Sequence, residues 1–430
     1  MLRLAKTKIC LNRVIAKSTT LLAHAVLRLV GIAAFTVLVL TASDPLRAAP
    51  RTSIRIGYVI SQSGPNEPGA SLTSLANYKL WVKTVNDAGG IMLSSINKRL
   101  PIEVIEYDDH SDLVDAVKGV EKLIKDDKVD FILPPWGTRL NLAVAPILDR
   151  AGYPLLASTA MIDNPTELAK RWSNVFWCTG STVEAARSLV AILAKLRADG
   201  KIGNSVAMIY VADELGIELS KSSRDVIRAA NFDLVYDRAY PFGTTALTPI
   251  LQEVKQRNPD VFIAFSYPPD TFALTERARA IHFNPKIYYT GVGTAFPDFR
   301  DRFTQDAQGV LGLGGWNADL PAAREYLRRH TAIIGQEPDR WASPVTYATL
   351  QVLQQAIERA GRIDRAAVIA EIKKGTFDTV AGPMTFKDNF FAGIWYVGQW
   401  QNGEFYGVAP DTLPGARKVI APKPPWGATN

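Results

Sequence analysis

Short apolar runs that end in loops, each followed by a helical pattern, recur along this chain. In the clearest case, the apolar run 129–133 enters the loop Pro134-Pro135-Trp136-Gly137-Thr138, and an apolar helical face follows at 139–150. Apolar runs of this length indicate buried strands. Repeated strand–loop–helix units favour a parallel sheet, in which ligands bind at the loops after the carboxyl ends of the strands. We therefore expect an α/β protein that binds something at these loops.

Two series of these units follow one another, at 54–178 and 179–296. A chain of 430 residues is also too long for one ordinary hydrophobic core. The expected strands lie at 54–60, 101–107, 129–133, 154–157, 205–211, 234–236, 260–265 and 286–289. The expected helices lie at 71–88, 112–125, 139–150, 183–198, 218–230 and 247–256, and a further helix follows the loop 266–270 and runs to about 281. The pattern predicts two similar lobes.

The remainder of the chain is more helical and then strand-like. Ser343, followed by Pro344, is a good N-cap for a helix that Gly361 would end. The segment 384–408 is strand-like, and Gln401-Asn402-Gly403 is a strong hairpin signal.

Most of the net charge lies in the first 48 residues. The whole chain has a formal net charge of +7, and residues 1–48 hold seven Lys or Arg and one Asp, which is 7 − 1 = +6. The rest of the chain is therefore nearly neutral, at 7 − 6 = +1. A near-neutral body does not support a nucleic-acid interface.

These 48 residues are typical of a targeting segment. A basic stretch precedes an apolar run of 12 residues, 29–40. A membrane span needs about 20 residues, whereas a signal-peptide core needs fewer. Residues 1–48 are therefore interpreted as a signal peptide for export to the periplasm, cleaved after Ser43, Ala48 or Ala49. An uncleaved anchor is the alternative.

Loss of the leader would remove Cys10 and leave Cys178 as the single cysteine. No intramolecular disulfide is then expected. A small buried hydrophobe is favoured for Cys178 over a nucleophile.

Common catalytic motifs are missing from the sequence. There is no Walker-type loop, no G-x-S-x-G elbow and no H-E-x-x-H. His110, His282 and His330 lie far apart and are expected at the surface or in loops, and Asp108-Asp109 is interpreted as a cap for the next helix. Neither an enzyme nor a cofactor or metal is expected.

Four segments carry a family likeness: Val85-Asn-Asp-Ala-Gly-Gly-Ile91, Tyr107-Asp108-Asp109, Ile147-Leu-Asp-Arg-Ala-Gly-Tyr-Pro154 and Thr379-Val-Ala-Gly-Pro-Met-Thr-Phe386. In this order they resemble the branched-chain amino-acid-type substrate-binding proteins of bacterial ABC importers, over about residues 52–408. The resemblance implies a type I periplasmic binding protein with two doubly wound parallel-sheet lobes, joined by a hinge that the chain crosses three times. It also implies a monomer that carries a small ligand in its cleft to an ABC permease.

By the same resemblance, the crossings fall near Cys178-Thr179, Gly315-Trp316 and Gly382-Pro383. The first lobe would then comprise 51–178 and 316–382, and the second lobe 179–315 and 383–430.

The resemblance also assigns a carboxylate site. It gives Thr138 the role of a hydroxyl donor, and Ser158, Thr159 and Ala160 that of backbone groups. Independently, Gly137 and Thr138 stand at a helix start, where free N–H groups and the helix dipole favour an anion. A plain helix cap is the alternative for Thr138.

In the second lobe, Tyr267 matches an aromatic wall position, and Leu215 stands where relatives have an aromatic residue. The loop 290–294 lacks the acid that would take an α-ammonium group. Trp136 is expected to stack on an aromatic or apolar ligand, and Arg139 either pairs with a carboxylate or is solvated.

The expected ligand is therefore an aromatic or aliphatic carboxylate without an α-amino group, with a branched-chain amino acid as the second hypothesis. A ligand-binding sensor without a transporter is the alternative function. An enzyme ranks third because no nucleophile–base set is present.

Overall fold

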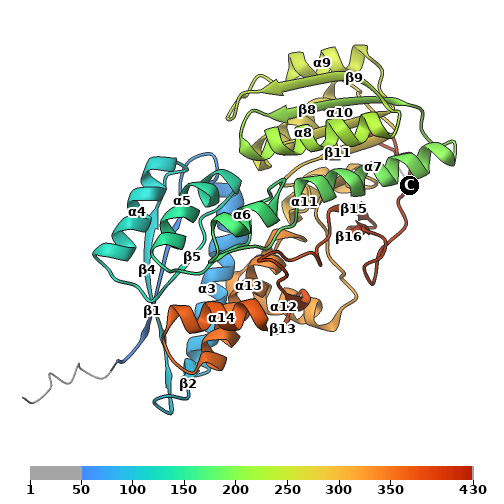
Figure 1. Ribbon diagram of the computed structural model, residues 1–430. Coiled ribbons are helices and arrows are strands. Elements are labelled where there is room, and N and C mark those ends of the chain that lie inside the picture. Colours follow the sequence, from blue (N-terminus) through green and yellow to red (C-terminus); the bar gives the residue numbers. More distant parts are fainter. Residues whose placement is uncertain (1–50, 429–430) are drawn as a thin grey trace, which may run out of the picture. The chain divides into compact units, whose positions relative to one another are not determined.

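Two groups of parallel strands organise the computed structural model, which describes residues 51–428 (Figure 1). In the first lobe, β1 (Ile54–Ile60) lies between β4 (Ile102–Asp108) and β5 (Phe131–Leu133), and both pairings are parallel. Beside them, β6 (Leu155–Ala157) pairs in parallel with β7 (Val175–Trp177). The leader predicted at 1–48 lies outside the described residues.

The second lobe contains one seven-stranded sheet. Its order is β16 (Glu404–Ala409), β15 (Val397–Gln401), β12 (Leu311–Leu313), β11 (Ile287–Thr290), β10 (Val261–Phe265), β8 (Ser205–Val211) and β9 (Asp233–Tyr240). The five strands from β12 to β9 are parallel, and β15 and β16 add an antiparallel edge. The carboxyl ends of the parallel strands therefore meet at one edge, as the repeated units predict.

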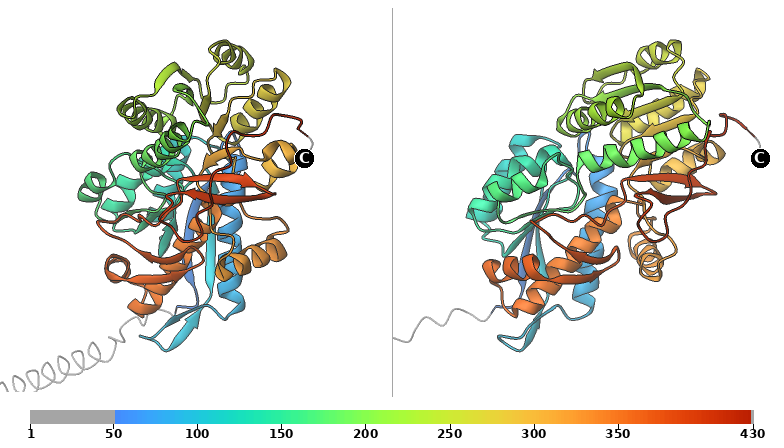
Figure 2. Two further views of the ribbon diagram at one scale, coloured as in Figure 1. Left: turned by 90° about the vertical axis from the view of Figure 1, so that its right-hand side faces the viewer. Right: turned by 45° about the vertical axis from the view of Figure 1, so that its right-hand side comes forward.

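Helices cover both faces of the first sheet. Alternate residues of a strand point to opposite faces, so Ile56 and Tyr58 join the core under α3 (Ala76–Asp87) and α13 (Ala342–Ala360). Val59 joins the core under α4 (Leu113–Lys125) and α5 (Thr138–Arg150). Figure 2 shows α3 and α13 side by side. This is the doubly wound arrangement expected from the sequence.

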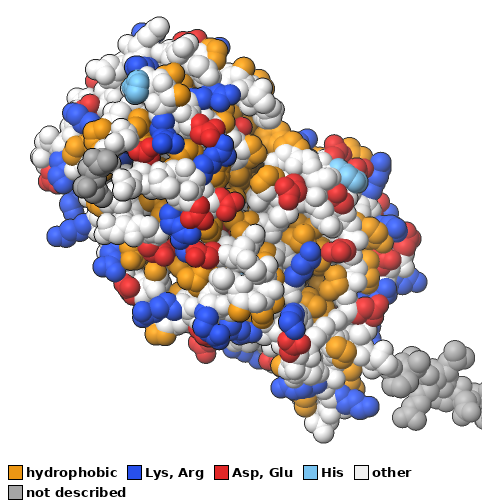
Figure 3. Space-filling view, turned by 180° about the vertical axis from the view of Figure 1, so that it is seen from behind, with side chains coloured by type: hydrophobic (Ala, Val, Ile, Leu, Met, Phe, Trp, Pro, Cys, Tyr) orange, Lys and Arg blue, Asp and Glu red, His pale blue; other side chains and the backbone are white. Residues whose placement is uncertain are grey.

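The remaining elements complete the two lobes. With the first lobe lie α2 (Glu67–Ala70), α6 (Pro165–Arg171), α12 (Pro321–Ile334), α14 (Arg365–Lys374) and the hairpins β2 (Ile91–Leu93)–β3 (Lys98–Leu100) and β13 (Thr376–Thr379)–β14 (Gly382–Thr385). With the second lie α7 (Thr182–Ala198), α8 (Glu214–Ala229), α9 (Thr248–Gln256), α10 (Pro268–Ala280) and α11 (Pro297–Phe303). Basic and acidic side chains are interspersed on the face drawn in Figure 3.

The third crossing lies further along the chain than the sequence predicts. Strand β14 still pairs with β13, and Met384 is fully buried in the core. Phe390 then bridges Trp177 of β7, so the chain leaves the first lobe only between 391 and 397. The prediction at Gly382-Pro383 is wrong because these residues begin the second strand of a hairpin that belongs to the first lobe.

Helix α13 begins at Ala342 and is capped by a residue that the sequence reasoning overlooked. The carboxylate of Asp339 accepts the backbone N–H groups of Trp341, Ala342 and Ser343 at 2.7–2.8 Å. The expectation that Ser343 caps the helix is therefore wrong, because the acid upstream takes these donors first. Gly361 ends the helix at φ 66°, as predicted.

The structure confirms the expectation for Cys178 and contradicts those for His330 and for the cap of helix α4. Cys178 is fully buried, as expected, and burial raises the pKa of its thiol. His330 is also fully buried, not at the surface, and its Nδ1 lies 2.9 Å from the Gln336 carbonyl oxygen. Helix α4 is capped by Asp112 and not by the Asp108-Asp109 pair.

No helix within residues 51–428 combines the length and apolar character that a membrane crossing requires. Within the same residues, no three His, Cys, Asp or Glu side chains gather in a way that could hold a metal ion.

Candidate functional site

The start of helix α5 leaves backbone donors facing the cleft between the lobes. Its N-cap is Gly137, at φ 87°, and no side chain caps the helix. The backbone N–H of Gly137 itself donates to the Thr159 hydroxyl at 3.0 Å. The first N–H groups of a helix have no partner within the helix, so this end favours an anion. The alternative that Thr138 caps the helix is not supported.

The Thr138 hydroxyl joins α5 to the loop after β6. Thr138 is fully buried; its Oγ1 accepts the backbone N–H of Met161 at 3.2 Å and donates to the Met161 carbonyl oxygen at 3.4 Å. A ligand at Thr138 would share this hydroxyl with the loop. Its role as a ligand donor stays a prediction.

The loop after β6 divides its polar groups between the cleft and the protein. Thr159 lines the cleft. The Ser158 hydroxyl accepts from the Thr346 hydroxyl of α13 at 3.2 Å, and the Ala160 carbonyl accepts the Thr179 hydroxyl at 2.6 Å. Thr159 is therefore the member of this trio that lines the cleft, and its contact with a ligand stays a prediction.

Aromatic rings meet across the two lobes. The rings of Trp136 and Tyr267 have centroids 5.5 Å apart, and Phe242 packs edge-on against Tyr267, also at 5.5 Å. The Trp136 indole N–H donates to the Thr73 hydroxyl at 2.8 Å, which fixes the ring. The Tyr267 hydroxyl donates to Asp213 at 2.6 Å, which fixes the opposite ring. Contacts of this geometry add to the burial of the rings themselves.

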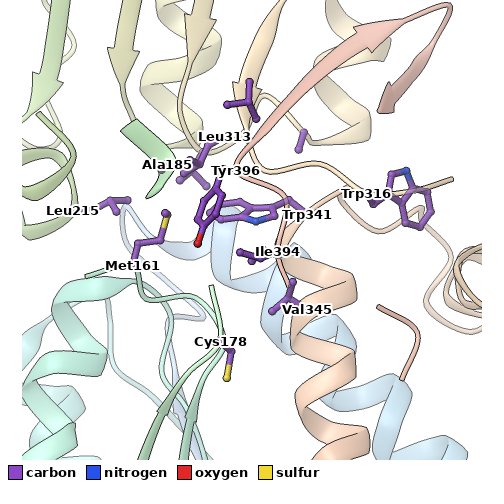
Figure 4. Packing of buried hydrophobic residues seen from close by; sticks show 14 of the residues in the cluster. Met161, Cys178, Ala185, Leu215, Leu313, Trp316, Trp341, Val345, Ile394 and Tyr396 are labelled. Carbon is purple, nitrogen blue, oxygen red and sulfur yellow. The ribbon is translucent and has the colours of Figure 1, made fainter. Parts of the chain in front are cut away.

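These rings separate the cleft into two compartments. The inner compartment has a volume of about 20 Å³ and is lined by Thr73, Trp136, Gly137, Thr159, Met161, Leu215, Tyr267, Val292, Trp341 and Ala342. The outer compartment has a volume of about 330 Å³ and is lined by Asn66, Ser111, Trp136, Gly137, Arg139, Leu140, Ala212, Asp213, Glu214, Ile217, Phe242 and Tyr267. Figure 4 shows Met161, Leu215 and Trp341 converging from three different elements.

Five of the eight predicted site residues therefore line the inner compartment: Trp136, Gly137, Thr159, Leu215 and Tyr267. Thr138, Ser158 and Ala160 lie behind it. The sequence did not point to the other five lining residues, Thr73, Met161, Val292, Trp341 and Ala342. Trp341 had no signal of its own, because it reaches the cleft from a segment between α12 and α13.

Trp341 brings an unused donor to the inner compartment. Its side chain is 6% exposed, and among the described residues its indole N–H has no hydrogen-bond partner. The ring packs against Gly314, where a Cβ atom would lie 1.9 Å from the indole Cγ. A buried donor without a partner is costly, so a ligand oxygen at this position would be stabilised.

The outer compartment contains charges of both signs. Asp213, after β8, accepts the Gly216 N–H at 2.9 Å in addition to the Tyr267 hydroxyl. Burial raises the pKa of its carboxyl group above the ordinary value, although both hydrogen bonds oppose the shift. Arg139, at the start of α5, acts on the same carboxylate from the first lobe. Glu214 is exposed beside it.

A polar contact also joins the lobes next to the cleft. The N–H of Asp163, in the loop after β6, donates to Glu218 of α8 at 3.1 Å. Lys221 of α8 reaches the Asp163 carboxylate at 3.3 Å. Burial, together with the nearby Asp163 charge, raises the pKa of Glu218 to about 7.

A family model described as "Periplasmic binding protein" matches residues 53–404. Among curated proteins, "Leu/Ile/Val-binding protein homolog 7" of Brucella abortus (strain 2308) is 22% identical over 387 residues, which cover 85% of this chain and 93% of that protein.

Solved structures share the fold. The branched-chain amino acid transporter substrate-binding protein LivJ from Streptococcus pneumoniae, in complex with isoleucine, has a TM-score of 0.71 at 19% identity, covering 86% of this chain and 100% of that one. A solute-binding protein of an ABC transporter from Rhodopseudomonas palustris BisB5, in complex with 3,4-dihydroxy benzoic acid, has a TM-score of 0.70 at 18% identity, covering 83% and 96%. These similarities confirm the predicted fold of two parallel-sheet lobes.

Proposed function

The chain belongs to the periplasmic binding protein family, and we propose that it captures a small organic acid without an α-amino group and delivers it to the permease of an ABC importer. The observation that carries this proposal is the lining of the inner compartment. It consists of apolar side chains, two threonines and one glycine, with no acidic or basic side chain among the described residues.

The carboxylate of the ligand would bind at the start of α5. Uncapped helix N–H groups and the helix dipole favour a negative group there. The unused indole N–H of Trp341 would add a donor on the opposite wall.

An α-ammonium group has no acidic partner in this compartment. The hydroxyls of Thr290 and Thr294 bond to each other at 2.7 Å, and Val292 is the residue of their loop that lines the compartment. Burying a charge without a partner is strongly unfavourable. The apolar walls formed by Trp136, Met161 and Leu215 instead suit an aromatic ring or a branched aliphatic chain.

Ligand access would require the lobes to part. The inner volume of about 20 Å³ holds roughly one water molecule. A hinge of three connecting segments permits such opening, and closure would then bury the ligand. The closed surface would be presented to the permease after export of the chain through its N-terminal leader.

A thermal-shift panel on the purified protein tests the proposal. Benzoate, 3-phenylpropionate and 4-methylpentanoate are compared with L-leucine, L-isoleucine and L-valine. A ligand at a hundredfold its Kd stabilises the folded protein by about 2.7 kcal/mol, so at least one of the three acids is expected to raise the melting temperature. A large shift with the amino acids alone would contradict the proposal.

A further inference from the structure

The outer compartment is too large and too polar to serve only as an opening to the inner one. Its volume of about 330 Å³ lies within the range of small-molecule sites. It is built from both lobes: Asn66, Ser111 and Arg139 come from the first, and Asp213 and Glu214 from the second.

The two compartments share the aromatic wall. Trp136, Gly137 and Tyr267 line both of them. Once the lobes part, a ligand whose carboxylate lies at the start of α5 could extend past the edges of the two rings. Its far end would then reach the polar side chains of the outer compartment.

Asp213 is the acceptor best placed for that far end. One of its oxygens accepts the Tyr267 hydroxyl and the other accepts the Gly216 N–H. Since each carboxylate oxygen has about two acceptor positions, Asp213 keeps acceptor capacity while both bonds hold it in place.

The charge balance selects the kind of group that would bind there. Two acids, Asp213 and Glu214, face one base, Arg139. The compartment therefore carries an excess negative charge, which disfavours a second carboxylate and favours a hydrogen-bond donor.

We propose that the outer compartment is a subsite for a hydroxyl, amide or amino group at the end of the ligand remote from its carboxylate, and that Asp213 is the specificity-determining acceptor. This proposal rests on the proposed function. It names the natural ligand as an organic acid that is longer than a branched-chain amino acid and carries a polar donor at its far end.

Calorimetry with two matched pairs of acids tests the subsite in the full protein. The pairs are benzoate with 4-hydroxybenzoate, and 3-phenylpropionate with 3-(4-hydroxyphenyl)propionate. For at least one pair, the hydroxylated acid is expected to bind about tenfold more tightly, the effect of one hydrogen bond to a charged group. Asp213→Asn should remove this preference, so that the two acids of the pair bind about equally.

Two further variants separate the subsite from wall packing. Glu214→Gln removes a charge from the same compartment and should retain the preference. Tyr267→Phe frees the Asp213 oxygen that Tyr267 occupies and should also retain it.

Equal affinities within both pairs in the unaltered protein would overturn the subsite while leaving the proposed function intact. The subsite would also be overturned if Asp213→Asn weakened the binding of the parent and the hydroxylated acid by the same factor. Binding of none of the four acids would contradict the proposed function, and the subsite with it.

Discussion

The ring of Trp136 in the first lobe packs against the ring of Tyr267 in the second, with centroids 5.5 Å apart and planes inclined by 51°. Each ring is fixed by a hydrogen bond within its own lobe, from Trp136 to Thr73 and from Tyr267 to Asp213. This pair divides the cleft into its inner and outer compartments. Substitutions that move either ring should therefore lower ligand affinity more than substitutions elsewhere that cost the same free energy of unfolding.

Trp136→Ala is expected to weaken the binding of an organic acid by at least tenfold. It should also lower the free energy of unfolding by about 3 kcal/mol, as is typical of a buried aromatic residue. Calorimetry and chemical denaturation measure the two effects. The matched control is Trp172→Ala, at a largely buried tryptophan of the first lobe whose ring packs at a tilt against Trp177. An equal loss of affinity in both variants would contradict a specific role for Trp136.

Gly69→Ala should displace the Trp136 ring without touching the ligand. A Cβ atom at position 69 would lie 2.2 Å from Cζ2 of that ring. The control is Gly119→Ala, another helical glycine, where a Cβ atom would lie 2.8 Å from Val59 in the core. Both variants are expected to be less stable by about 1–3 kcal/mol. Only Gly69→Ala should reduce affinity in calorimetry, and unchanged affinity would show that the position of Trp136 does not matter.

Thr138→Ala is expected to weaken acid binding by about 1–2 kcal/mol, because its hydroxyl bonds both the N–H and the carbonyl of Met161, which lines the inner compartment. Thr179→Val serves as the control, because its hydroxyl bonds Ala160, which lines neither compartment. Unchanged affinity of Thr138→Ala in calorimetry would show that its hydroxyl does not position the ligand site.

The burial of Glu218, together with the nearby Asp163 charge, should make stability depend on pH. The folded protein raises the pKa of Glu218 from 4.5 to about 7, so the folded state favours the protonated form. Its contribution is therefore fully present below about pH 4.5 and is lost as the pH rises through 7. Asp270, whose pKa burial raises to about 6, acts in the same direction.

Melting temperatures measured from pH 4 to pH 8 test this dependence. The difference between the unaltered protein and Glu218→Gln isolates the Glu218 contribution from that of Asp270. The charges next to Glu218 are Asp163, Lys221 and Glu214, and they remain in the variant. A difference that is constant over this pH range would contradict the assignment.

Much of the fold could be predicted because its signals are local. The β1 prediction at 54–60 matches the observed strand, since its apolar pattern lies within seven residues. The turn at Asn402 and Gly403 has φ of 53° and 80°, as the hairpin signal requires. Strand β7 and helix α6 were missed, since three buried residues after a short polar helix give little periodicity.

The site was predictable only where it follows a strand. Trp136, Gly137 and Tyr267 stand directly after β5 and β10, so the sheet rule finds them. Thr73 and Trp341 enter the cleft from a π-helical turn and from the segment before α13. Their approach depends on the tertiary packing of α3 and α13, which no local pattern encodes.

The central claim is that the inner compartment accepts a carboxylate and excludes an α-ammonium group. Calorimetric titration of the purified protein with 3-phenylpropionate and L-phenylalanine, and with 4-methylpentanoate and L-leucine, tests it most directly, since each pair differs only in that group. We expect at least one acid to bind at least tenfold more tightly than its amino acid. Tighter binding of L-leucine or L-phenylalanine than of the matching acid would contradict the claim.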